Sequence, residues 1–121
     1  MSSVREDLRK MRTVVAKLKR DPRDGKVRRA VCLASRFLWI EVRNLHQEAP
    51  GALNVELARQ IDEVFSTAEK ELSCEDDRCF RNVRQRYRTS KRALRPVLAE
   101  AMAEMVRDRT ETKLRPALSQ S

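Results

Sequence analysis

Hydrophobic residues recur every three or four positions through most of the chain, which is the spacing of helices that bury one face. No stretch alternates hydrophobic and polar residues for long enough to predict a strand. Breaks in the pattern fall at Asp21-Pro22 and at Ala49-Pro50-Gly51, and Arg95-Pro96 marks a kink or a break, because the residue before a proline avoids the helical conformation. The pattern therefore predicts helices over about 3–20, 25–48, 52–72, 75–94 and 97–109.

Polar residues that can cap a helix stand before several of these segments. Ser2 or Ser3 precedes the first, and Asp24 precedes the second. Ser73, with Asp76 three residues later, resembles a capping box before the fourth. These residues support the predicted starts of the helices.

The predicted fold class is all-α: a compact bundle of four to five helices joined by short turns. The second segment is apolar around more than half of its circumference, so we expect it to be the central helix, covered by several neighbours. From Thr110 onwards the chain is polar, contains Pro116 and lacks periodicity. We therefore predict a single helical-bundle domain over 1–110 and a disordered tail over 111–121.

The composition adds a strong positive charge to this picture. The net charge is +9 and the isoelectric point about 10.2, while aromatic residues make up only 4% of the chain. A basic protein attracts acidic partners, and arginine suits bidentate contacts to phosphate or carboxylate. The charge predicts a binding protein, and its distribution along the chain predicts where the partner binds.

The fourth predicted helix concentrates this charge, since residues 78–95 contain eight basic residues and no acidic one. At about 100° per residue, six of them share one sector beside the apolar side. We call this sector the arginine face: Arg81, Arg84, Arg88, Lys91, Arg92 and Arg95. The predicted nucleic-acid-binding residues are the arginine face, with Arg78 at its start and, around the turn before the second helix, Lys26, Arg28 and Arg29.

Three partners for the arginine face stay open at this point. The first is nucleic acid, since like charges one turn apart repel until phosphates neutralise them. The second is an acidic protein surface or an anionic membrane. The third is internal, because the other face of the 52–72 helix is mostly acidic, with Glu56, Asp62, Glu63, Glu69 and Glu71.

Recognition of a base sequence is not expected. Asn82 and Gln85 are the only amide side chains on this helix, and no helix-turn-helix, RNP or zinc-finger pattern is present. Tyr87 points to the apolar side and suits core packing better than base stacking. We expect recognition of backbone and shape, as in duplex RNA or DNA.

The sequence offers little for catalysis. His46 is the only histidine, and the glycines, Gly25 and Gly51, form no phosphate-binding loop. Cys74 and Cys79, with Cys32 and His46, could form a zinc site or a redox disulfide, but plain thiols fit better. We predict a protein without enzymatic activity or cofactor.

The expected location is intracellular, cytoplasmic or nuclear. An odd number of cysteines fits reduced thiols, and the first residues resemble no signal peptide. No apolar stretch is long enough for a transmembrane segment.

Two further features bear on partners. Ala and Met gather on one face of the 97–109 segment, which we expect either to be buried within the bundle or to leave room for a homodimer that forms through this face or through the first helix. Residues 56–65, followed by 80–84, resemble part of the central helical domain of the S-II transcription elongation factors, although the downstream Asn-Leu-Lys pattern is missing. The resemblance implies an alternative function, namely a helical protein-interaction module that docks on transcription or other nucleoprotein machinery.

Overall fold

The computed structural model describes residues 3–73 and 78–119 of the chain. Within these residues there are four α-helices, one short 3-10 helix and no strand, which confirms the all-α fold class. The elements are α1 (Val4–Arg20), α2 (Gly25–Glu48), η1 (Pro50–Ala52), α3 (Val55–Leu72) and α4 (Arg78–Ser119).

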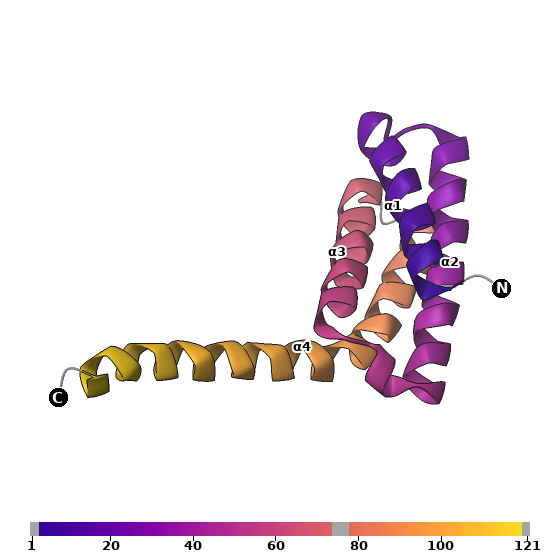
Figure 1. The fold of residues 1–121 in the computed structure, drawn as a ribbon. Coiled ribbons are helices and arrows are strands. Elements are labelled where there is room, and N and C mark those ends of the chain that lie inside the picture. Colours follow the sequence, from indigo (N-terminus) through magenta and orange to yellow (C-terminus); the bar gives the residue numbers. More distant parts are fainter. Residues whose placement is uncertain (1–2, 74–77, 120–121) are drawn as a thin grey trace.

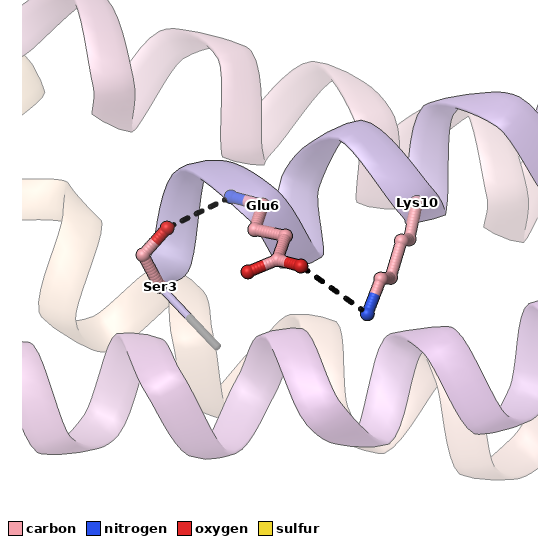
Figure 2. Close-up of polar contacts among 3 residues, drawn as sticks. All are labelled: Ser3, Glu6 and Lys10. Carbon is pink, nitrogen blue, oxygen red and sulfur yellow. Dashed lines mark hydrogen bonds and ion pairs between the residues drawn. The ribbon is translucent and has the colours of Figure 1, made fainter. Parts of the chain in front are cut away.

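Side-chain caps begin the first three helices. Ser3 Oγ accepts a hydrogen bond from the Glu6 amide at 3.1 Å, and the Glu6 carboxylate lies 3.7 Å from Lys10 Nζ (Figure 2). Asp24 Oδ1 accepts from the Lys26 amide at 2.9 Å, so the predicted starts of α1 and α2 are confirmed.

The start of α3 lies slightly later than expected. Asn54 Oδ1 accepts from the Leu57 amide at 2.8 Å, and η1 occupies the turn before it. The predicted capping box of Ser73 and Asp76 lies partly outside the described residues.

The core is built from one apolar side of each helix. α1 packs against α2 and α3, and α4 packs against the same two helices from the other side, while the described parts of α1 and α4 do not touch (Figure 1). Phe65 of α3 stacks on Tyr87 of α4 with ring centroids 5.9 Å apart. The least exposed large side chains are Phe65, Met11, Leu18, Leu38, Ile61, Leu72 and Leu94.

The prediction that α2 is central and covered on several sides is wrong. α2 contacts α1 and α4 extensively but α3 only slightly. Its outer side carries Leu33, which is 54% exposed, and Phe37, which is 50% exposed. The apolar spread along the sequence was therefore not a sign of full burial, and one strip of α2 faces solvent.

The fourth and fifth predicted helices are one continuous helix, α4, which passes through Pro96. A proline inside a helix removes one backbone hydrogen bond and bends the axis without having to end the helix. Figure 1 shows α4 turning away from the bundle and running outwards as a long projection. We call residues 97–119 the α4 arm.

The arm also differs from the expectation for the C-terminus. Where the sequence predicted a disordered tail over 111–121, α4 extends to Ser119, and residues 120–121 lie outside the described part of the chain. Residues 97–115 contain neither glycine nor proline, so nothing local ends the helix there. In the first turns of the arm Met102 is 68% and Val106 63% exposed.

The burial pattern makes a stability difference within α2 testable. Leu38 is 0% exposed, so Leu38→Ala leaves a cavity and should lower the free energy of unfolding by about 2–5 kcal/mol. The same substitution at exposed Leu33 should cost less than about 1 kcal/mol. Urea unfolding of the two variants measures both values, and equal losses would contradict the packing of α2.

Candidate nucleic-acid interface

The arginine face lies on the outer side of α4. Arg81, Arg88, Lys91, Arg92 and Arg95 are exposed, and only Arg84 is half-buried. The adjoining side of the same helix is buried and carries Phe80, Val83, Ser90 and Leu94. The helical spacing that predicted this face therefore placed its members correctly.

A groove of about 650 Å³ runs between α3 and α4 along one edge of the arginine face. Arg84, Arg88 and Lys91 line it from α4, and Lys70 lines it from α3. The aromatic rings of α4 form part of its wall: Lys91 Nζ lies 5.4 Å from the centre of the Tyr87 ring, and Arg84 Cζ lies 5.9 Å from that of Phe80. These contacts hold the stems of the two cations against apolar surface.

Internal pairing with the acidic side of α3 reaches only part of the arginine face. Arg84 Nε lies 3.9 Å from Glu69 Oε1. Within the described residues no hydrogen bond or ion pair holds Arg81, Arg88, Arg92 or Arg95. Among the described residues, most of the face therefore has no acidic partner.

Two α3 acids that could have paired with the arginine face have other partners. Asp62 accepts a hydrogen bond from the Tyr87 hydroxyl at 2.9 Å, and Glu56 accepts one from Gln60 at 2.9 Å. Burial and the hydrogen bond to Asp62 raise the pKa of Tyr87 to about 12. Tyr87 thus has a core role, as its position on the apolar side indicated.

The second predicted basic cluster does not join the arginine face as a unit. Arg28 donates to the carbonyl oxygen of Pro22 at 2.8 Å and to that of Leu72, at the end of α3, at 3.4 Å. Its guanidinium therefore fastens α2 to the turn before it and to α3. Lys26 and Arg29 are exposed.

Arg29 and Arg78 meet in a second groove, of about 420 Å³, between α2 and α4. Arg36 and Arg86 also line this groove, and none of its described lining residues carries a carboxylate. Arg78 and Arg29 are thus brought together on a different flank of α4 from Arg88 and Lys91. The predicted site residues form two basic surfaces rather than one.

Sequence reasoning did not single out Arg36 or Arg86 as site residues. Arg36 follows Arg29 by seven residues, a spacing that returns to nearly the same side of a helix and could have indicated Arg36, whereas Arg86 lies about 80° around the helix from Arg78. Arg86 Nη1 donates to the carbonyl oxygen of Cys32 at 2.6 Å and to Ser35 Oγ at 2.9 Å, so it also ties α4 to α2.

Two of the candidate chemical groups, Cys32 and Cys79, line the groove between α2 and α4, whereas His46 lines another pocket. Cys79 Sγ donates to the Arg28 carbonyl at 3.1 Å. Cys74, and with it the zinc or disulfide alternative at 74–79, lies outside the described residues. Among the described residues no group of three or more His, Cys, Asp or Glu side chains could hold a metal ion. Nor does the described part of the chain contain a helix long and apolar enough to cross a membrane.

No protein-family model, no curated protein and no solved structure matches this chain. The resemblance of residues 56–65 and 80–84 to the S-II elongation factors gains no support from these comparisons. The candidate interface therefore has to be judged from its own residues.

The environment of Tyr87 can be tested directly, because it is the only tyrosine in the chain. Ultraviolet absorbance of tyrosinate should titrate with a midpoint of about 12 in the folded protein and about 10 in urea. The unfolded chain loses this proton first, so the free energy of unfolding should fall as the pH rises from about 10 to about 12.

Asp62→Asn serves as the companion variant. It removes the carboxylate but keeps most of the burial, so the midpoint should drop below that of the wild type and stay above 10. A wild-type midpoint near 10 would contradict the contact between α3 and α4.

Proposed function

We propose that the protein is a non-enzymatic nucleic-acid-binding protein that recognises the backbone and shape of duplex RNA or DNA through the arginine face of α4. The observation that carries the proposal is the row of exposed arginines on one rigid helix that have no acidic partner in the described structure. It would act in the cytoplasm or nucleus, and it needs no cofactor.

The length of the row suits a phosphate backbone. From Arg81 to Arg95 the helix rises by roughly 20 Å at about 1.5 Å per residue. Each arginine that neutralises a phosphate releases condensed counterions, which favours binding and makes it depend on salt. The same contact relieves the repulsion between arginines one turn apart.

The surroundings of the two amide side chains on the arginine-bearing part of α4, Asn82 and Gln85, support a recognition that does not depend on base sequence. Asn82 faces the α2–α4 groove, where its Nδ2 lies 3.9 Å from Cys32 Sγ. Gln85 is therefore the one amide of residues 78–95 that is exposed. A single amide among arginines reads little sequence, whereas arginines on phosphates fix the position of the protein on a duplex.

Lys70, Lys26 and Arg29 extend the proposal to the flanks of the arginine face. Lys70 lines the α3–α4 groove beside Arg88, so it can contact the same strand of the nucleic acid as Arg88 does. Arg29 lines the other groove and can contact a duplex only if the duplex spans α4. The central contacts are therefore assigned to Arg81, Arg88 and Arg92.

A charge reversal at the centre of the face tests the proposal. The triple variant Arg81→Glu, Arg88→Glu, Arg92→Glu should weaken binding to duplex RNA or DNA at least about tenfold at ~150 mM salt. It should also make the plot of the logarithm of the binding constant against the logarithm of the salt concentration less steep, by roughly 0.9 for each phosphate that the variant no longer neutralises. A mobility-shift series across salt, with duplex RNA, duplex DNA and single strands, measures both quantities.

The matched control carries the same change in net charge on α1, which does not contact α4 in the described structure. Arg5→Glu, Arg9→Glu, Arg12→Glu should bind like the wild type, because these exposed residues lie on another surface. Wild-type protein that fails to retain any of the nucleic acids at ~150 mM salt would rule out the proposal and favour the alternative of a protein-interaction module.

A further inference from the structure

A separate pocket of about 240 Å³ lies between the later turns of α2 and residues 89–93 of α4. The side chains on which its chemistry depends come from both helices: Trp39, Val42, Arg43, His46, Ser90 and Arg92. Arg92 is also a member of the arginine face, so the pocket adjoins the proposed nucleic-acid surface. The other five residues belong to neither of the two basic surfaces described above.

Two polar groups of this pocket lack the hydrogen bonds that buried polar groups normally make. Ser90 is 2% exposed, and its Oγ has no hydrogen-bond partner among the described residues. The indole Nε1 of Trp39 is also buried and has no acceptor within that part of the chain. An indole N–H can only donate, and a serine hydroxyl can rotate to suit an acceptor. A ligand that brings acceptor oxygens into the pocket would therefore satisfy both groups.

The charged side chains of the pocket are all basic. Arg43 Cζ lies 4.8 Å from the centre of the Trp39 ring, a contact that holds the guanidinium beside the pocket. Neither Arg43 nor Arg92 forms an ion pair with a described acid, and no described lining residue carries a carboxylate. Two permanent cations and two donors without acceptors favour a ligand that carries two negative charges and several oxygens.

We infer that this pocket binds the phosphate group of a phosphate monoester. Such a group carries about −1.5 to −2 charges at pH 7 and three acceptor oxygens, which matches the two guanidiniums better than a carboxylate does. The apolar part of the wall, with Val42 and the Trp39 ring, suits a small organic group attached to the phosphate. Two sources carry this chemistry: a small soluble phosphate ester, and the terminal phosphate of a nucleic acid. The site goes beyond the proposed nucleic-acid binding, and only the second source depends on it.

Trp39 is the only tryptophan in the chain, so its fluorescence reports on the pocket directly. Titration with phenyl phosphate, without nucleic acid and at constant ionic strength, should change the emission with a dissociation constant below about 1 mM. Benzoate, which carries a carboxylate on the same ring, should bind at least about tenfold more weakly. Equal binding of the two compounds, or no change in emission up to ~10 mM phenyl phosphate, would overturn the inference.

Substitution of the two arginines tests whether binding occurs in this pocket. Arg43→Gln and Arg92→Gln should each weaken the binding of phenyl phosphate at least about tenfold, because each removes a charge-assisted contact. Arg9→Gln removes the same charge from an exposed position on α1 and should bind like the wild type. If the pocket variants lose no more affinity than Arg9→Gln, the ligand responds to the overall charge of the protein and the site is refuted.

Ser90→Ala separates ligand binding from folding. The hydroxyl has no described partner to lose, so the free energy of unfolding should stay the same or rise. Binding of phenyl phosphate should nevertheless weaken at least about fivefold, because the ligand loses a donor. A variant that unfolds more easily, or that binds phenyl phosphate as tightly as the wild type does, would contradict the role assigned to Ser90.

A pair of duplexes, with and without terminal phosphates, identifies the source of the phosphate. If a nucleic acid supplies it, the phosphorylated duplex should bind more tightly than the duplex with terminal hydroxyls, and Ser90→Ala should remove the difference. Equal binding of the two duplexes, together with binding of phenyl phosphate, would assign the pocket to a soluble phosphate ester. Failure of both duplexes to bind would contradict only the proposed function, because the titration with phenyl phosphate contains no nucleic acid.

Discussion

The burial of one side of α4 between α2 and α3 decides most of what this molecule presents to solvent. Val83 and Leu94 have no exposed surface, so the rotation of the helix is set. Once that rotation is set, helical geometry turns Arg81, Arg88 and Arg92 outwards together. The basic surface therefore depends on the core, since a change in how α4 packs would redirect every arginine along it.

Polar contacts across the same junctions make this packing specific. Arg86 reaches from α4 to the backbone of Cys32, and Tyr87 reaches from the same helix to Asp62 on α3. Near the start of α2, Arg28 reaches to the carbonyl oxygen of Leu72 at the end of α3. These bonds give two of the arginines, Arg86 and Arg28, a structural role, so the total charge overstates what is available to a partner.

Features set by neighbouring residues could be predicted from the sequence, whereas features set by distant ones could not. Ser3 and Asp24 act within one turn of their own position, so the caps and limits of α1 and α2 followed directly. The exposure of Leu33 depends on where α1 and α4 lie, and the role of Arg28 depends on a carbonyl 44 residues away. At Pro96 the choice between a kink and a break stayed open for a related reason, because whether a proline ends a helix or only bends it depends on what surrounds the backbone. The arginine face was predictable because a helical period alone defines it, but its division from Arg29 and Arg78 needed the positions of α2 and α3.

Pro96 has one more consequence, for how the molecule opens. Proline has no backbone N–H, so the ladder of helical hydrogen bonds in α4 has a gap at the point where the bundle gives way to the arm. Before Pro96 the backbone amides of α4 are shielded from water by the core, and in the arm they are shielded mostly by the hydrogen bonds of the helix itself. We therefore expect amide hydrogen exchange in α4 to divide into two cooperative units, with the arm opening at a lower free energy than the bundle. The arginine-bearing half would then keep its geometry while the outer turns of the same helix open and close.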